Sequence, residues 1–141
     1  MTDTGVTISI APAVDVVVLD LWDDQTPDLT GITALTVEPG RYWLIDTAAQ
    51  MSALAAQVAD HGALTPIHGG LMRATFNGAG WRELLMHGGW FDAEDTAFGP
   101  GACAATLLHH VSVWIAPQTD ESAHVYFAPS YTADLRKRWG C

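Results

Sequence analysis

The residues best suited to metal or acid–base chemistry in this chain are its six histidines. They are His61, His68, His87, His109, His110 and His124. His109 and His110 are adjacent in a segment that reads as a strand, so their side chains should point to opposite faces and could not hold one ion together. No two histidines have the H-x-x-x-H spacing that places ligands on one face of a helix. The sequence therefore predicts isolated histidines and no metal site.

Two short motifs resemble catalytic or cofactor loops but lack their context. His87-Gly88-Gly89 is similar to esterase oxyanion loops, yet none of the five serines stands in the G-x-S-x-G sequence that such enzymes need. The run from Gly99 to Ala104 fits G-x-G-x-x-A, but it precedes a predicted strand, whereas a dinucleotide motif opens a helix. We therefore expect no catalytic and no cofactor-binding residues in this chain.

Large aromatic side chains are the more informative feature, because tryptophan is enriched at the energetic centres of protein interfaces. The six tryptophans are Trp22, Trp43, Trp81, Trp90, Trp114 and Trp139. Most of them are expected in the core. Trp90, which lies between Gly89 and Phe91 in a loop, and Trp139, near the C-terminus, are the candidates for contact with a partner.

Charge and composition exclude several classes of partner. The 141 residues carry 16 acidic and 6 basic side chains, for a formal charge of −10, whereas nucleic acids and anionic membranes attract clustered Lys and Arg. Cys103 and Cys141 have neither disulfide-framework nor zinc-site spacing, which indicates free thiols. There is no positively charged signal-peptide start and no long apolar run. We expect one soluble, cytoplasmic domain over residues 1–141.

The apolar pattern predicts the elements that must position these residues. Extended segments are expected at 6–10, 14–22, 32–37, 41–46, 64–67, 71–76, 105–116 and 124–128. Helices are expected at 48–61, where Thr47 and Gln50 match a capping box, after Asn77, and after Ser130. His68-Gly69-Gly70 should form a tight reversal. In the last helix, Tyr131, Leu135 and Trp139 share one face.

The middle of the chain reads strand, helix, strand, strand, helix, strand. This is the order of a ferredoxin-like split βαβ sheet with helices on one face, to which a hairpin strand and a C-terminal helix are added. The predicted class is α+β.

One segment carries a family resemblance. The run from Phe98 to Leu108 resembles an F-x-P-G-x-C-A-x-T-x-L run in the gamma subunit of heterotetrameric sarcosine oxidases. It matches at Phe98, Pro100, Gly101, Cys103, Ala104 and Thr106. Pieces at 40–44, 81–85 and 129–131 are also similar, so that the resemblance covers about Gly40 to Trp139. It adds Phe98 and Pro100 to Trp90 and Trp139 as expected interface residues, although Pro100 and Gly101 could instead fix a turn ahead of a buried Cys103.

The resemblance implies a fold and a role. The fold is that of the N-terminal, folate-binding domain of the glycine-cleavage T-protein. The expected partners are an alpha subunit with NAD and a tetrahydrofolate-binding domain, a beta subunit with FAD that shares FMN with alpha, and a small delta subunit that binds zinc. That flavoenzyme heterotetramer acts in sarcosine catabolism and one-carbon metabolism. It oxidatively demethylates sarcosine or a related N-methyl amino acid and passes the one-carbon unit to tetrahydrofolate. The gamma subunit is not its catalytic chain.

Two alternatives stay open at this point. The chain could be a free-standing tetrahydrofolate or one-carbon-binding module, although Lys137 is its single lysine and leaves little to anchor the glutamate tail of a folate. It could also be a small ferredoxin-like regulatory domain that binds a metabolite.

Overall fold

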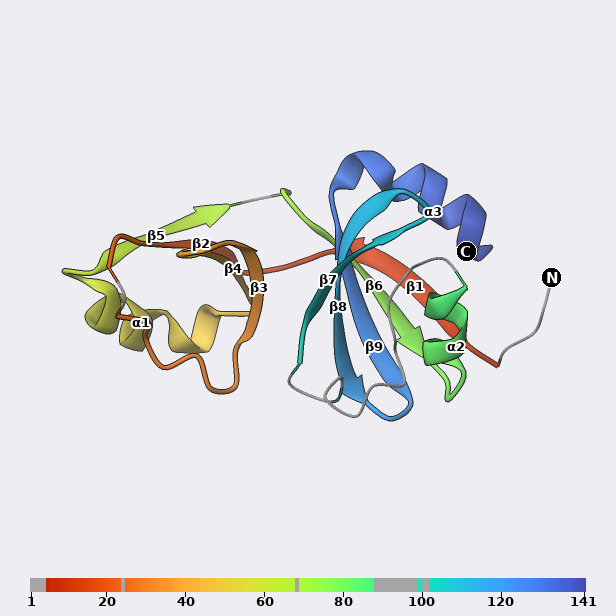
Figure 1. The fold of residues 1–141 in the computed structure, drawn as a ribbon, viewed down its shortest axis with the longest axis horizontal. Coiled ribbons are helices and arrows are strands. Elements are labelled where there is room, and N and C mark those ends of the chain that lie inside the picture. The colour runs from red at the N-terminus through yellow and green to blue at the C-terminus, as the bar shows by residue number, and fades with distance from the viewer. Residues whose placement is uncertain (1–4, 24, 68, 88–98, 100–101) are drawn as a thin grey trace. The chain divides into compact units, whose positions relative to one another are not determined.

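The computed structural model describes residues 5–23, 25–67, 69–87, 99 and 102–141. The chain divides into two compact units. The outer unit consists of Met1–Pro12 and Gly70–Cys141, and the inserted unit consists of Ala13–Gly69 (Figure 1). The expected single domain over residues 1–141 stays a prediction, which unfolding measurements would test.

The outer unit is built on a five-stranded antiparallel sheet with the order β1-β6-β9-β8-β7. The strands are β1 (Thr7–Pro12), β6 (Met72–Asn77), β7 (Ala104–Leu108), β8 (Val111–Thr119) and β9 (Ser122–Phe127). Its helices are α2 (Trp81–Met86), a 3-10 turn η2 (Pro129–Tyr131) and α3 (Thr132–Trp139). Trp81 and Leu85 of α2 and Leu135 of α3 join Phe76 and Val125 of the sheet in one buried core. Both helices therefore contribute to the same apolar layer.

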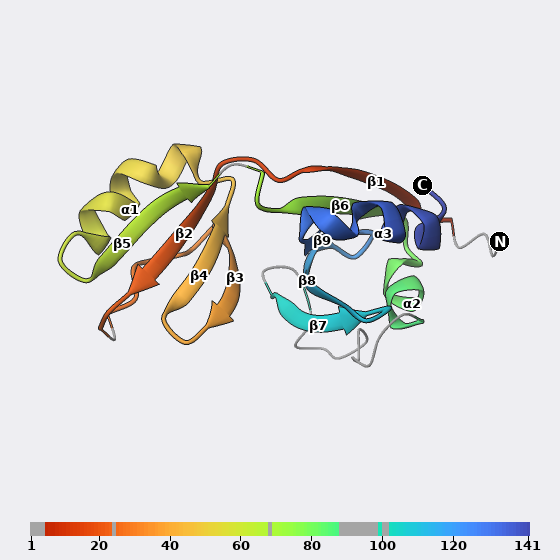
Figure 2. The same ribbon diagram turned by 90° about the horizontal axis from the view of Figure 1, so that it is seen from above.

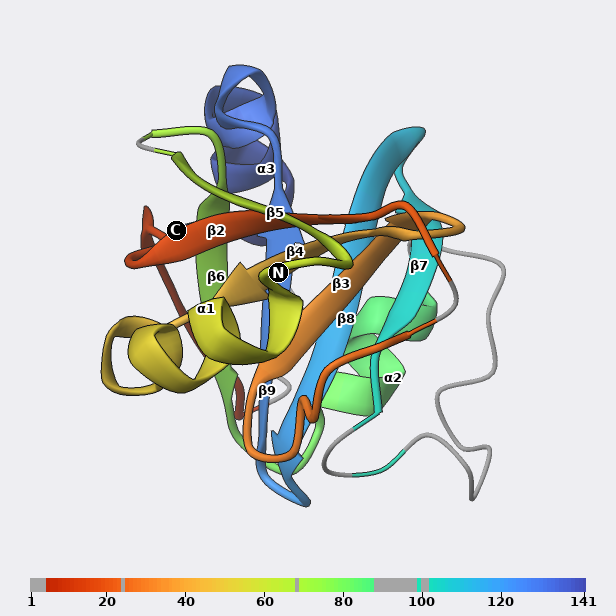
Figure 3. The same ribbon diagram turned by 90° about the vertical axis from the view of Figure 1, so that its left-hand side faces the viewer.

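The inserted unit has a four-stranded antiparallel sheet with the order β3-β4-β2-β5. The strands are β2 (Val16–Leu21), β3 (Thr33–Glu38), β4 (Arg41–Ile45) and β5 (Gly62–Ile67), and the helical segments are η1 (Ala48–Gln50) and α1 (Met51–Val58). Figures 2 and 3 show α1 beside this sheet. Leu54 and Val58 of α1 are buried against Leu19 and Leu44, which gives this unit its own apolar cluster.

The α+β class, the β8–β9 hairpin and the C-terminal helix are confirmed. The single ferredoxin-like sheet is corrected to two sheets. The reason is long-range pairing: β5 pairs with β2, and β6 pairs with β1 and β9, so β5 and β6 do not form the expected hairpin around Gly69. Strands β1 and β2, which lie within the first 21 residues, therefore pair with β6 and β5, and the two halves of the predicted sheet belong to different sheets.

The helices begin differently from the sequence prediction. The Thr47 hydroxyl does not cap a helix; it donates a hydrogen bond to the Asp15 carbonyl oxygen at 2.8 Å, and η1 precedes α1. Asn77 ends β6, and Gly80 is the N-cap of α2. Ser130 lies within η2 rather than capping the last helix. Tertiary and turn contacts have replaced the local caps that the sequence suggested.

The predicted strand 105–116 is two strands joined at His109 and His110. Leu108 pairs with Val111, and both histidines have positive φ angles, 50° and 68°. These are the features of a two-residue type I′ hairpin turn. The expectation that these two side chains alternate along a strand is therefore wrong.

Candidate functional site

Of the four expected interface residues, Trp90, Phe98 and Pro100 lie outside the described residues. Trp139 is half-buried at the end of α3. Its ring meets Phe76 edge-on, with centroids 5.0 Å apart, and Phe127 at 6.2 Å. Trp139 therefore holds α3 on the core of the outer unit, and only its remaining exposed part is available to a partner.

The other residues singled out by the sequence are dispersed. Within the described ranges, no three or more His, Cys, Asp or Glu side chains gather where they could hold a metal ion. Partial burial, assisted by the nearby Arg138 guanidinium, lowers the pKa of His109. Cys103 was expected to be buried but is exposed, as is Cys141, and both are free thiols. In the described part of the chain, no helix is both long and apolar enough to cross a bilayer.

The inserted unit contains a pocket of about 230 Å³. It is lined by Asp15, Val16, Val17, Thr47, Ala48, Met51, Pro66 and Ile67. Thr47 is fully buried, and its hydroxyl and backbone N–H both donate to the Asp15 carbonyl oxygen, at 2.8 and 3.2 Å. The pocket is mostly apolar and smaller than the roughly 300–1,000 Å³ of typical cofactor sites. It could take a small apolar group, but it does not have room for a folate.

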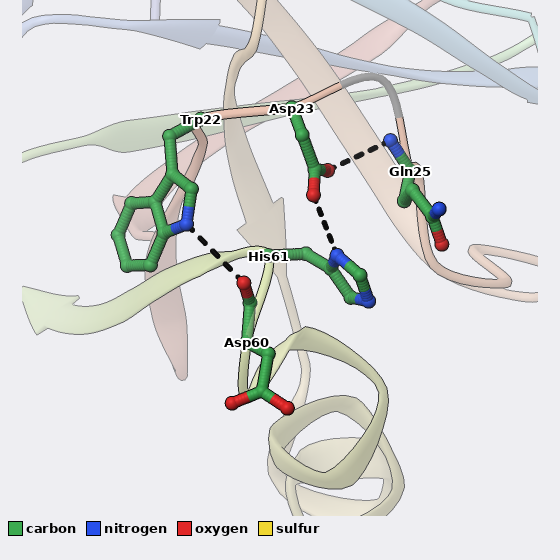
Figure 4. Close-up of polar contacts among 5 residues, drawn as sticks. All are labelled: Trp22, Asp23, Gln25, Asp60 and His61. Atoms are coloured by element: carbon green, nitrogen blue, oxygen red, sulfur yellow. Dashed lines mark hydrogen bonds and ion pairs between the residues drawn. The ribbon is translucent and has the colours of Figure 1, made fainter.

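A polar cluster occupies one end of the same sheet (Figure 4). This Trp22 cluster consists of Trp22, Asp23, Gln25, Asp60 and His61. Trp22 and Asp23 follow β2, whereas Asp60 and His61 lie between α1 and β5. The backbone N–H of Trp22 donates to the His61 carbonyl oxygen at 3.0 Å, which extends the pairing of the two strands and brings these segments together.

Side-chain hydrogen bonds fix the geometry of the cluster. The indole N–H of Trp22 donates to the Asp60 carbonyl oxygen at 3.3 Å. Nδ1 of His61 lies 2.6 Å from Oδ2 of Asp23, and the backbone N–H of Gln25 donates to Oδ1 of Asp23 at 2.9 Å. The hydrogen bond from His61, followed by the one from Gln25, lowers the pKa of Asp23. The Trp22 side chain nevertheless stays 66% exposed.

This arrangement holds an exposed aromatic ring beside a His–Asp pair, a geometry that can bind a partner. A His–Asp pair needs an adjacent nucleophile or reacting group to act as a general base. Among the described residues, no serine or cysteine bonds to Asp23 or His61. The sequence did not predict this cluster, because Trp22 was not among the tryptophans expected at an interface, and because 38 residues separate the members of each pair. The polar residues directly after Trp22 were the sequence feature that could have indicated its exposed position.

The fold defines a class of protein: an α+β chain with two antiparallel sheets and a C-terminal helix. No protein-family model matches the sequence, and no curated protein matches it. Among solved structures, the chain is similar to a chain of the heterotetrameric sarcosine oxidase from Corynebacterium sp. U-96 in complex with pyrrole 2-carboxylate, with a TM-score of 0.72 and 14% identity. The match covers 91% of this chain and 78% of that chain. The two chains share a fold.

Proposed function

We propose that this chain is a non-catalytic, gamma-type subunit of a multi-subunit, flavin-dependent sarcosine oxidase-like complex. The complex oxidatively demethylates an N-methyl amino acid and transfers the one-carbon unit to tetrahydrofolate. The observation that carries the proposal is the fold shared over 91% of the chain with a chain of a heterotetrameric sarcosine oxidase. The residue matches between Phe98 and Thr106 support the gamma subunit in particular.

The partners follow from the same proposal. An alpha subunit supplies NAD and the tetrahydrofolate-binding domain, a beta subunit supplies FAD and shares FMN with alpha, and a delta subunit binds zinc. This chain packs against the alpha subunit. Its two free cysteines are in keeping with a reducing, cytoplasmic location.

The test is assembly. We expect the tagged chain, purified gently from the cells that make it, to be recovered with larger flavin-bearing polypeptides identified by mass spectrometry. The chain purified alone should be colourless and should not oxidise sarcosine. An oxidase that keeps its full flavin content, activity and subunit assembly after this chain is deleted would contradict the proposal.

The folate-binding alternative is less well supported. The pocket of about 230 Å³ is small, and Lys137 is the only lysine of the chain. Calorimetric titration of the isolated chain with tetrahydrofolate separates the two functions, because the free-standing module requires saturable binding and the gamma-type subunit requires none.

A further inference from the structure

Trp22 presents the most exposed large apolar side chain in the described part of the molecule. Its exposed fraction is 66%, compared with 52% for Leu107 and 42% for Tyr131. An indole of this size left in water forgoes the free energy that burial would supply. Fixed aromatic rings of this kind are enriched at the centres of protein interfaces. The ring therefore has the character of an interface anchor.

The ring is also held in place before any partner arrives. The backbone of Trp22 is bound to His61, and its indole N–H is bound to Asp60. On the other side of the strand end, the N–H of Leu21 donates to the Gly40 carbonyl oxygen at 2.8 Å. A side chain that is already ordered loses little rotamer entropy on binding, so more of its contact free energy contributes to affinity.

The charge around the ring specifies the chemistry of the partner. The inserted unit has a single Lys or Arg, Arg41, against eight acidic residues. These are Asp15, Asp20, Asp23, Asp24, Asp28, Glu38, Asp46 and Asp60. Arg41 is already engaged, with Nε 2.6 Å from Asp20 and Nη1 2.9 Å from Glu38. In Figure 4 the Asp60 backbone carbonyl faces the Trp22 indole, whereas the Asp60 carboxylate points away from both Trp22 and His61. The inserted unit therefore presents an exposed aromatic ring among negative charges, and its one arginine is already paired with Asp20 and Glu38.

We propose that Trp22 and Asp60 form the centre of a docking surface for a basic protein segment, in which one arginine or lysine side chain stacks on the indole and another pairs with the carboxylate. Cations bind the faces of tryptophan rings, and a nearby carboxylate adds charge pairing. This inference rests on the proposed function, since the segment belongs to a larger flavin-bearing subunit. Electrostatic complementarity would also steer the encounter of the two subunits.

The experiment measures the affinity of the full chain for the flavin-bearing subunits purified without it. Trp22→Ala should weaken binding about tenfold or more, and Trp22→Phe, which keeps an aromatic face, should weaken it less. Asp60→Asn should weaken binding several-fold and reduce its salt dependence.

Tyr131→Ala and Asp120→Asn are the matched controls in the outer unit. They remove another exposed aromatic ring and an equal charge, and their affinities should stay within about twofold of wild type. Circular dichroism checks that each variant is folded, and Trp22→Phe and Asp60→Asn carry the test if Trp22→Ala does not fold.

The outcomes separate this inference from the proposed function. If the wild-type chain binds the flavin-bearing subunits and the Trp22 and Asp60 variants bind equally well, the docking surface is wrong and the proposed function stands. If the wild-type chain binds none of them, the proposed function fails, and titration with a hexa-arginine peptide decides the surface. Saturable binding that Trp22→Ala abolishes and Tyr131→Ala retains supports it, whereas equal or absent binding overturns it. Self-association through Arg136, Lys137 and Arg138, seen by sedimentation, would also overturn it.

Discussion

Among single residues, the two tryptophans Trp81 and Trp22 form a natural comparison. Trp81 is fully buried in the outer unit, and its indole N–H donates to the Asp120 carbonyl oxygen at 3.1 Å. Truncation to alanine removes the apolar contacts of a fully buried indole, leaves a cavity and breaks its hydrogen bond to Asp120, so we expect Trp81→Ala to lower the free energy of unfolding by about 3–5 kcal/mol. Trp22→Ala, at an exposed position, should cost less than about 1 kcal/mol. Urea denaturation of both variants measures the difference, and equal losses would contradict the burial assigned to Trp81.

The pair Asp23–His61 predicts a pH dependence on the acid side. The folded pKa of Asp23 lies below its ordinary value of 3.8 because of the hydrogen bonds from His61 and Gln25. A lowered folded pKa contributes stability above pH 3.8, and this contribution is lost as the pH falls through the lower folded value. We expect carboxyl NMR titration to show Asp23 with a midpoint below 3.8, and His61→Ala to raise that midpoint.

Asp28 provides the control for this titration. The pKa of Asp28 is also lowered, but by hydrogen bonds from Thr30. His61→Ala should therefore leave the Asp28 midpoint in place. A parallel shift of both carboxyl groups would mean that the substitution perturbs the whole surface rather than one hydrogen bond.

Helices and strands were predictable where the residues that define them lie close together in the sequence. The alternating run 41–46 became β4, and the apolar spacing of Leu54 and Val58 became the buried face of α1. The helix starts were not predictable, because the Thr47 hydroxyl finds its partner at Asp15, 32 residues away. The turn at His109 and His110 was missed for a related reason: neither residue is a usual turn former, and the pairing of β7 with β8 imposes the conformation.

That turn supplies a prediction for an element. Histidine with positive φ is strained relative to asparagine or glycine, and Asn-Gly is the favoured pair for a type I′ turn. The double substitution His109→Asn/His110→Gly should therefore raise the free energy of unfolding by about 1 kcal/mol. Glu121→Gly in the β8–β9 turn is the control, since Glu121 does not have a positive φ. It should bring no gain. Thermal unfolding measures both, and a loss of stability in the double variant would contradict the turn assignment.

At the scale of the whole molecule, the order of the strands depends on pairing between segments that are far apart in the sequence, which a local sequence pattern does not reveal. The sequence order strand, helix, strand, strand, helix, strand is present from β4 to β7, and it suggested one sheet. The partition into two sheets arises because β1 and β2, next to each other in the sequence, pair with β6 and β5 respectively. The interface residues could not be predicted for another reason. The sequence shows which residues are aromatic but not which of their rings are buried: Trp139 packs on Phe76, whereas Trp22 is exposed.

These pairings predict that the two units can be separated. Pro12 of β1 is the register partner of Met72 of β6, so a short turn that contains Asn-Gly can replace residues 13–69 and connect Pro12 to Gly70 at the paired ends of the two strands. All strand pairings of the outer sheet, and its apolar core, lie within the outer unit. We expect the joined outer unit to show a β-rich circular dichroism spectrum, tryptophan fluorescence at the shorter wavelengths typical of a buried ring such as Trp81, and one cooperative urea transition. Val16 and Ile67 are likewise register partners at the other cut, so residues 13–69 can be made alone and measured in the same way. If both pieces are unfolded while the intact chain unfolds in one transition, then residues 1–141 form one cooperative domain and each sheet depends on the other.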